Sequence, residues 1–393
     1  MTFDPSLFEP SAGGGFSGAV TEVRRSSYFE RVGGSLLGIP LGILLLILPL
    51  SLLWFNERRS VEAEQAIAEA LTKVVLAPSA AIDRRNEGQL VHVTGVAIAP
   101  AVVDAVLGLS FANALLVRRQ AEMYQWVETQ STRTARDWAG NETTTTSFAY
   151  KQGWYPGRIR SEQFKQGQGH ENPLLSAESM LITADKATVG AFRLDPRTLK
   201  AIAEGANTGV DFVPLAPAKA PVGFTLQPGG TLYAGKSPTA PRVGDVRLTY
   251  SGLPSGRPVT VLARQSGDGF AEYNAGRNYP IHLAAVGDYS PQVLLDKLAG
   301  SEAFLTWVLR LAGVVVLFIA FAMILGPLST VLSIIPGLGT LAEGAVAAVA
   351  LVLALVVGIV VIALAWLVVH PLVSLLVIGG ALALGGTILF LRQ

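Results

Sequence analysis

Residues 34–54 read GSLLGIPLGILLLILPLSLLW, an apolar run without a single charge. A run of this length is enough to cross the roughly 30 Å hydrocarbon core of a bilayer as one α-helix. Pro40 and Pro49 predict kinks, which neighbouring helices tolerate inside a membrane. The run is too long for a signal peptide, and the residues that follow it, FNERR, offer no small-residue cleavage site. It therefore predicts a retained membrane anchor.

The composition extends this interpretation to the whole chain. Only 15% of the 393 residues are charged and the mean hydropathy is +0.45, whereas soluble domains carry nearer a quarter of charged residues. From residue 311 to the C-terminus the charged residues are only Glu343 and Arg392. A net charge of +1 and the lack of cysteine exclude a nucleic-acid binder driven by bulk charge, disulfides and thiolate metal sites. The chain is expected to be an integral membrane protein rather than a soluble enzyme.

Three further spans are predicted near the C-terminus, and the dipeptide His370-Pro371 separates the last two. The predicted architecture is an α+β integral membrane protein with four transmembrane helices, one N-terminal and three C-terminal. A large mixed, β-rich domain separates the first two helices. The expected segments are a partly disordered cytoplasmic tail (1–33), helix 1 (34–56), the extracytoplasmic domain (57–303), helix 2 (304–327), a connector (328–342), helix 3 (343–369) and helix 4 (371–391).

The connector PLSTVLSIIPGLGTLA, residues 327–342, is uncharged and apolar, which is unusual for a water-exposed loop. Its apolar positions 328, 331, 332 and 335 share one helical face, and the segment is too short to cross a bilayer. An interfacial or re-entrant helix and packing against the other spans both fit this pattern.

The domain is predicted to contain more strand than helix, from alternating and helical apolar patterns. Expected strands lie at 89–99, 115–132, 143–152, 187–193, 245–251 and 258–265, of which the second and third form a hairpin; expected helices lie at 61–75, 195–204 and 290–298.

No catalytic, cofactor-binding or metal site is predicted. His92, His170, His282 and His370 are not at metal-ligand spacing, and His92 is expected to be a hydrogen-bonded strand residue. No pair of carboxylates is predicted among Glu57, Glu87, Glu122 and Glu128. Arg310 is interpreted as a snorkelling interfacial residue and Glu343 as a helix N-terminal cap, with an ion-pathway role as the alternative for both.

Several blocks along the chain resemble the LUMA family, also called transmembrane protein 43. They are residues 28–36 and 53–58, NEGQLVHVTG at 86–95, EMYQWVE at 122–128, VGDVR at 243–247 and AWLVVHPL at 365–372. The family pattern after the first span is Trp-Asn-Glu-Gly-Arg, where this chain has Phe55 and Arg58 in place of the Trp and the Gly.

The resemblance implies four crossings with one large lumenal domain, and no catalytic residues. In animals it implies the endoplasmic reticulum and inner nuclear membrane, self-association, and partners of the emerin and lamin type. The Ala, Gly and Val richness without cysteine indicates a bacterial member, for which we expect the inner membrane and a periplasmic domain. The expected partners are the lipid bilayer, further copies of the chain and other membrane proteins, and not nucleic acid.

The main functional hypothesis is a non-enzymatic membrane scaffold that self-associates and organises membrane proteins or lipids. Small residues at 344, 345, 347, 348 and 358 would allow close helix approach between subunits. An oligomeric ion channel is the alternative, motivated by Arg310 and Glu343, and a membrane-anchored hydrolase is third.

Four spans and the arginines Arg24, Arg25 and Arg31 before the first predict that both termini are cytoplasmic, although Arg58 and Arg59 weaken this bias. Protease added outside sealed spheroplasts should therefore cut within 57–303 and spare both tails. Cleavage of the tails with an intact domain would reverse the topology.

Overall fold

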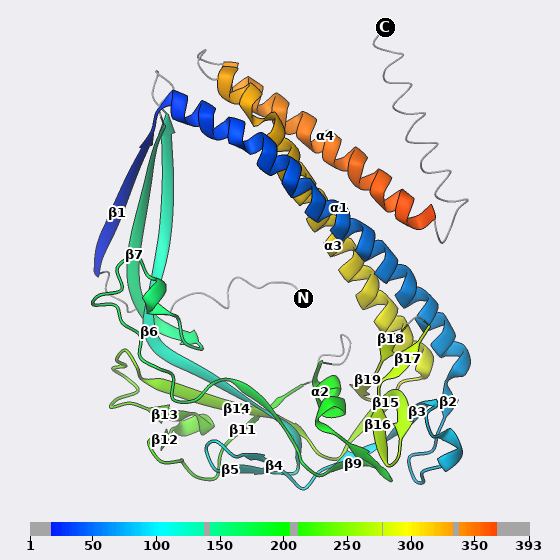
Figure 1. Cartoon of the computed structure of the whole chain (residues 1–393). Coiled ribbons are helices and arrows are strands. Elements are labelled where there is room, and N and C mark those ends of the chain that lie inside the picture. Colours follow the sequence, from blue (N-terminus) through cyan, green and yellow to red (C-terminus); the bar gives the residue numbers. More distant parts are fainter. Residues whose placement is uncertain (1–16, 137–141, 205–210, 277, 333–337, 368–393) are drawn as a thin grey trace.

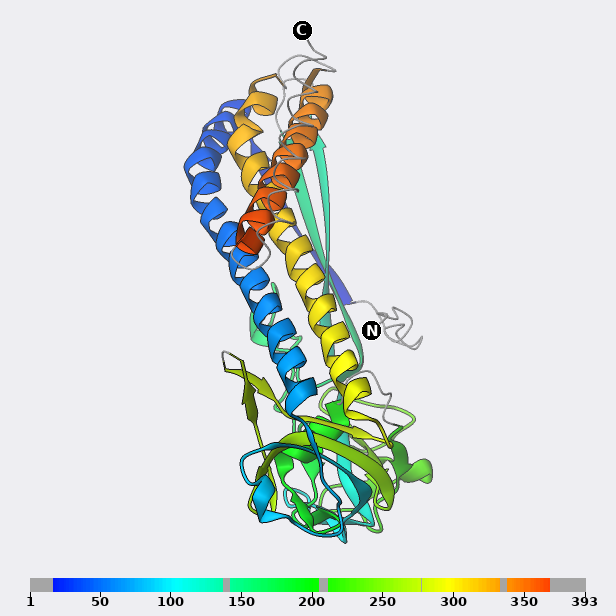
Figure 2. The same ribbon diagram turned by 90° about the vertical axis from the view of Figure 1, so that its right-hand side faces the viewer.

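The structure is a computed structural model that describes residues 17–136, 142–204, 211–276, 278–332 and 338–367. Three long helices form one side of an arch, a β-rich domain forms its base, and a narrow set of strands rises from the base to the top of the helices (Figure 1). Seen from the side, α1 and α3 run next to each other and α4 crosses in front of them (Figure 2).

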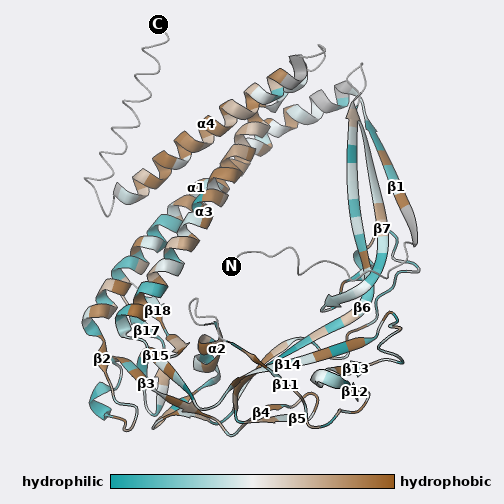
Figure 3. Ribbon diagram, turned by 180° about the vertical axis from the view of Figure 1, so that it is seen from behind, coloured by the Kyte–Doolittle hydropathy of each residue, from teal (hydrophilic) through white to brown (hydrophobic). Residues whose placement is uncertain are grey.

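The helices are α1 (Tyr28–Lys73), α2 (Pro196–Glu204), α3 (Pro291–Leu332) and α4 (Leu338–Leu367). Within the described residues, three of them, α1, α3 and α4, are long and apolar enough to cross a membrane. Their hydrophobic parts lie away from the domain, as the colouring of Figure 3 shows. The predicted fourth span at 371–391 lies outside the described residues and stays a prediction.

The first and second spans continue without a break into helices that the sequence analysis treats as separate. Helix α1 includes both 34–56 and 61–75 up to Lys73, and α3 includes 290–298 from Pro291 as well as 304–327. The junction at 55–60, FNERRS, contains neither Gly nor Pro, so no residue in it interrupts the helical hydrogen bonds. Ser27 and Glu30 form a reciprocal capping box that begins α1.

The connector expected at 328–342 differs from the prediction. Residues 328–332 continue α3 beyond Pro327, and α4 already begins at Leu338, while 333–337 lie outside the described residues. The Ser329 and Thr330 hydroxyls donate to the Gly326 carbonyl oxygen at 2.9 and 3.0 Å, which supplies hydrogen bonds around the proline. Because α4 begins five residues earlier, Glu343 lies in its second turn, and the N-cap interpretation is wrong.

Two sheets account for most strands. The long sheet contains β1 (Ser17–Ser26), β6 (Ala114–Arg136), β7 (Glu142–Pro156), β8 (Met180–Thr183), β11 (Val213–Leu215), β12 (Thr225–Leu226), β13 (Leu232–Ala234) and β14 (Val246–Pro254). The second sheet contains β2 (Val75–Leu76), β3 (Leu90–Ile98), β9 (Ala187–Val189), β10 (Phe192–Leu194), β15 (Arg257–Ser266), β16 (Gly269–Ala271) and β19 (Leu283–Val286). Two separate strand pairs are β4 (Ala101–Asp104) with β5 (Leu109–Ala112) and β17 (Tyr273–Ala275) with β18 (Tyr279–Ile281).

The long sheet has the order β1-β7-β6-β14-β13-β12, and the second sheet has the order β10-β9-β3-β15-β16. The expected strand at 187–193 is divided into β9 and β10 by Gly190, whose φ of +58° makes a tight turn. A Cβ on Gly190 would stand 2.1 Å from the Ser79 carbonyl oxygen, so only glycine fits there. The other expected strands are confirmed as β3, β6, β7, β14 and β15.

The core of the domain lies between the two sheets and includes side chains such as Leu116, Val246, Val91 and Val259. A second apolar cluster joins the domain to the helices, because Ala66 and Ala70 of α1 and Leu295 of α3 pack against Leu262 and Ala285 of the second sheet. The lower parts of both helices are therefore components of the domain.

A buried ion pair inside the domain joins β4 to the long sheet. Arg119 of β6 donates from Nη1 to Asp104 Oδ2 at 2.6 Å, and the Tyr250 hydroxyl donates to the same oxygen at 2.9 Å. Both charged side chains are almost fully buried, and Asp104 also accepts from the backbone of Val106 and Leu107. These bonds satisfy the carboxylate, so the pair is structural.

We define the arm as residues 17–26, 128–136 and 142–150, the three strands that rise from the domain. The N-terminal tail was expected to be partly disordered and separate from the domain, but residues 17–26 form β1 and pair with β7 from Ser17↔Tyr150 to Ser26↔Glu142. Val20, Thr21 and Val23 favour a strand, while the partner is more than a hundred residues away in sequence and leaves no local signal.

Helices α1 and α3 approach closely where α1 carries glycine. A Cβ on Gly42 would lie 2.7 Å from the Ala320 carbonyl oxygen, and one on Gly38 would lie 2.9 Å from the Met323 carbonyl oxygen. In lipid, where apolar burial gives no drive for association, such close backbone contact is a main source of helix packing. Gly34 is the matched exception, since a Cβ there meets nothing within 4 Å.

Substitution of Gly42 by valine should therefore separate α1 from α3 and lower the free energy of unfolding by about 1–3 kcal/mol, the usual cost of overpacking. Thermal unfolding in detergent measures this effect. Gly34→Ala is the control and should leave the unfolding midpoint unchanged or slightly higher, because alanine favours a helix. Equal destabilisation by both variants would contradict the packing argument.

Candidate functional site

Polar side chains from α1, α3 and α4 meet in a buried group at the boundary between the apolar helix segments and the domain. We call this group the ionic cluster and define it as Asn56, Glu57, Arg59, Glu302, Thr306, Arg310 and Trp366. It is the main concentration of buried charge within the membrane-capable helices that the structure describes.

Glu57 is the centre of the cluster. Arg310 of α3 binds its carboxylate through two bonds of 2.7 Å, from Nε to Oε1 and from Nη2 to Oε2. The indole Nε1 of Trp366 on α4 donates to Oε2 at 2.6 Å. Glu57 is 1% exposed. Bidentate arginine–carboxylate pairs are among the strongest hydrogen-bonded pairs in proteins. Through its bonds to Arg310 and Trp366, the Glu57 carboxylate connects three helices.

The sequence positions these groups by helical spacing. Glu302, Thr306 and Arg310 are each four residues apart, so they form one stripe along α3. Helix α1 runs antiparallel to α3 and presents Asn56 and Glu57 to this stripe, where Asn56 Nδ2 donates to the Thr306 carbonyl oxygen at 3.2 Å.

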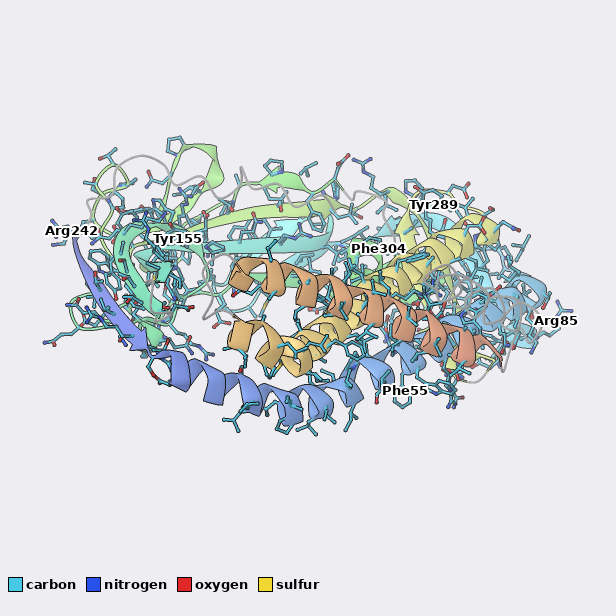
Figure 4. All side chains as sticks on the ribbon, turned by 90° about the horizontal axis from the view of Figure 1, so that it is seen from above. Phe55, Arg85, Tyr155, Arg242, Tyr289 and Phe304 are labelled. Carbon is cyan, nitrogen blue, oxygen red and sulfur yellow. The ribbon has the colours of Figure 1, made fainter. Side chains whose placement is uncertain are left out.

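Aromatic residues mark the depth of the cluster. Trp54, Phe55, Phe304 and Trp307 are all exposed, and Phe55 and Phe304 lie on opposite flanks of the α1–α3 pair (Figure 4). The Arg310 guanidinium lies 4.8 Å from the centre of the Trp307 ring. Exposed tryptophans beside a charged group are typical of the membrane–water boundary. The ionic cluster therefore lies at the domain-side end of the apolar helix segments, where a membrane–water boundary is expected.

The lower part of the cluster connects the helices to the domain. Arg59 of α1 forms an ion pair with Glu302 of α3, and its Nη2 donates to Thr306 Oγ1 at 3.3 Å. The Tyr279 hydroxyl of β18 donates to Glu302 Oε1 at 2.8 Å. Burial and the neighbouring carboxylate raise the pKa of Tyr279 well above its usual value, so this hydroxyl keeps its proton at physiological pH.

The cluster holds helices together and offers little to a substrate. Both oxygens of Glu57 are used by Arg310 and Trp366, and no group of three His, Cys, Asp or Glu side chains among the described residues could hold a metal ion. Asn56 Oδ1 and Arg59 Nε are buried without a hydrogen-bond partner in the described part of the chain. They are the points at which a buried water would be accommodated.

The structure brings one Thr–His pair to a cavity, which bears on the hydrolase hypothesis. His282 Nε2 lies 2.9 Å from Thr198 Oγ1, beside a cavity of about 470 Å³ lined by Arg197, Lys200 and Glu272. Thr198 is fully buried, and its hydroxyl donates its one proton to Asp195 Oδ1 at 2.6 Å. The Asp195 carboxylate caps α2, because it also accepts from the Thr198 backbone N–H at 2.8 Å. The Thr198 hydroxyl is held by this cap and is buried away from any substrate. Burial lowers the pKa of His282, which keeps the ring neutral.

The other sequence candidates have structural roles. His92 Nε2 lies 2.8 Å from the Tyr289 carbonyl oxygen, as expected for a hydrogen-bonded strand histidine. His170 stacks on Tyr150 with ring centres 3.9 Å apart. Three of the glutamates have other partners: Glu87 accepts from the Gly267 backbone, Glu122 pairs with Arg247, and Glu128 accepts from Tyr150. His370 lies outside the described residues.

The snorkelling interpretation of Arg310 is wrong, because its guanidinium turns inward to Glu57. Sequence reasoning missed this pair because the two residues are 253 positions apart. One signal was present: Glu57 and Arg310 are opposite charges, each placed at the domain-side end of an apolar run.

Replacing Glu57 by glutamine should leave Arg310 buried without a counter-charge and lower the free energy of unfolding by about 3–5 kcal/mol. The control is Glu62→Gln on the same helix, which removes a carboxylate from an exposed pair with Arg58 and should cost less than about 0.5 kcal/mol. Adding Arg310→Gln to Glu57→Gln should restore part of the loss. Unfolding in detergent compares the wild type, the single variants Glu57→Gln, Arg310→Gln and Glu62→Gln, and the double variant. Losses from the two cluster variants that simply add in the double variant would contradict a direct pair.

The chain is similar in sequence to known transmembrane proteins. The family model described as transmembrane protein 43 matches residues 123–371. Transmembrane protein 43 of Homo sapiens is 29% identical over 90% of each chain, and that of Rattus norvegicus is 30% identical over 93% of this chain and 92% of the relative. The Drosophila melanogaster homolog is 26% identical over 70% of this chain and 73% of its own. No solved structure matches the chain significantly. These relatives are named as transmembrane proteins, and this chain belongs to the transmembrane protein 43 family.

Proposed function

We propose that the chain is a non-enzymatic membrane scaffold that self-associates and organises membrane proteins or lipids. The observation that carries this proposal is the unbroken α1–α3 pair. Both helices pass from the apolar segment into the domain, and the ionic cluster joins them at the boundary. Residues 57–73 extend the helix by about 25 Å, so the domain is held rigidly at a set distance from the membrane.

The rigid α1–α3 pair would hold the surface of the domain in place for partner molecules, whereas an enzyme often needs its domain to move during a reaction cycle. The joint between helices and domain is made of packed apolar side chains and the Tyr279–Glu302 hydrogen bond, rather than a flexible linker. The large domain would then offer its sheets to partners at a constant height above the bilayer. We further propose that the membrane is the cytoplasmic membrane of a bacterium, with the domain in the periplasm.

The small residues of α4 divide into two groups. Gly358 faces its own chain, since a Cβ there would lie 3.1 Å from Val314 Cγ2 of α3. Gly344, Ala345 and Ala348 are exposed, and a Cβ on Gly344 meets nothing within 4 Å. Contact between subunits through α4 would therefore use the second group and not Gly358, which was expected to belong to it.

An oligomeric ion channel is a second candidate, favoured by the polar arm. Its strands reach the N-terminal end of α1, so they stand at the depth of the apolar helix segments. Polar strands at this depth require water rather than lipid around them. Reproducible single-channel currents from the purified protein in planar bilayers would replace the scaffold proposal by this one.

The scaffold proposal predicts that the protein purified in mild detergent has a mass that is a multiple of 41.4 kDa after correction for bound detergent, by light scattering. A monomeric mass at all concentrations would contradict it. Gly358→Leu should lower the thermal stability, because the new side chain meets Val314 of the same chain, and should leave the subunit number unchanged.

A further inference from the structure

The arm ends where α1 begins, and this determines its depth in the membrane. Ser26, the last residue of β1, pairs with Glu142 at the tip of the hairpin, and α1 starts two residues later at Tyr28. The domain lies at the other end of α1 (Figure 1). Strands β6 and β7 therefore travel from the domain to the far end of the apolar helix segment. At about 3.3 Å per residue, the ten residues of β1 alone cover roughly the thickness of a hydrocarbon core.

Neither face of the arm is suited to lipid. The registers β1–β7 and β7–β6 sort its side chains into two faces. One face carries Thr21, Val23, Arg25, Thr143, Thr145, Ser147, Ser131 and Arg133, and the other carries Glu22, Arg24, Glu142, Thr144, Thr146, Thr132 and Thr134. Charged and hydroxyl groups on both faces exclude contact with hydrocarbon.

The two edges of the arm are also unpaired. Strand β14 pairs with β6 only as far as Met123. Beyond that point, within the described residues, β7 is the only strand that pairs with β6, and no strand pairs with the outer edge of β1. Every second backbone N–H and C=O along these edges therefore lacks a ladder partner. At bilayer depth such groups need a protein partner or enclosed water, because hydrocarbon cannot accept their hydrogen bonds.

We propose that the arm binds the arm of a second copy of this chain, with the β6 edge of one copy against the β1 edge of the next. This inference rests on the proposed self-association and names the surface that produces it. Both β1 and β6 are antiparallel to β7, so they run in the same direction at opposite edges. Identical copies arranged around one axis can then pair as parallel strands.

The contact joins two different edges, so it is head-to-tail, and with the copies arranged around one axis it closes into a ring. In that ring the arms line the interior and the apolar helices face the lipid, which removes the polar strands from hydrocarbon. A two-fold contact between two β1 edges is disfavoured, because it would bring Arg24 and Arg25 of both copies onto one short strand pair. At the level of Arg24 and Arg25, the edge of β6 carries Thr134 and Ala135, so an unstaggered contact between β1 and β6 places neither arginine directly opposite another arginine.

The chain has no cysteine, so the inference can be tested by disulfide formation in native membranes. Val23 and Arg133 are both exposed, and Thr145 of β7 lies between them in the register. Within one chain they are two strands apart, about 9–10 Å, which is too far for a disulfide. Between neighbouring copies they would face each other. Val23→Cys is combined in turn with Ser131→Cys, Arg133→Cys and Ala135→Cys to allow for stagger between copies.

Oxidation of at least one double variant should give a ladder of cross-linked bands that ends at the mass of the native oligomer. The variant Thr145→Cys with Arg133→Cys is the control, because adjacent strands should give a disulfide within one chain and establish that the arm is folded. Each single variant should give no ladder.

An oligomeric protein whose three double variants all fail to cross-link, while the control succeeds, would overturn the arm contact and leave the scaffold proposal standing. A monomeric mass would overturn both. Efficient dimers from Val23→Cys alone would show a two-fold contact of β1 and would overturn the ring.

Discussion

One carboxylate holds the membrane part of this protein together. Glu57 accepts two hydrogen bonds from Arg310 and one from Trp366, and so joins α1, α3 and α4 at a single depth. The cost of removing the Glu57 carboxylate from water is offset by its hydrogen bonds to Arg310 and Trp366. Loss of Arg310 would leave the carboxylate as a buried charge without a counter-charge. Arg59, Glu302 and Tyr279 extend the same cluster into the domain. The packing of the three helices and their attachment to the domain both depend on this group.

A second constraint follows from the chain path. Residues 17–26 lie immediately before a membrane-capable helix, yet they pair with a hairpin that begins in the domain beyond the other end of that helix. This pairing brings the polar strands of the arm to the depth of the apolar helix segments. The strands need water or protein around them, whereas the helix segments need lipid. The single chain does not resolve this conflict within its described residues. Assembly of several copies does, since it gives the strands an interior and leaves the helices in lipid.

The sequence predicted much of the fold correctly. Uncharged apolar runs located α1, α3 and α4, and alternation located β3, β6, β7, β14 and β15, because both signals are local. Helix continuity at 55–60 was missed because the hydropathy changes there while the helix propensity does not. Continuity at 328–332 was missed because a proline such as Pro327 usually ends a helix. The sequence identified two residues of the candidate site but did not predict that they form a pair. Glu57 and Arg310 were noticed separately, but their partnership needs a contact across 253 residues.

By itself the sequence determined that this is a membrane protein with one large β-rich domain, and it indicated the transmembrane protein 43 family. Composition and periodicity decide such features because water and lipid sort side chains wherever the chain goes. Only the tertiary structure decided that Glu57 binds Arg310, that Gly42 lies against the Ala320 carbonyl and that the tail becomes a strand of the arm. These features depend on which distant segments become neighbours. A buried charge or a strand edge gains its partner through that three-dimensional proximity, for which the local pattern carries no signal.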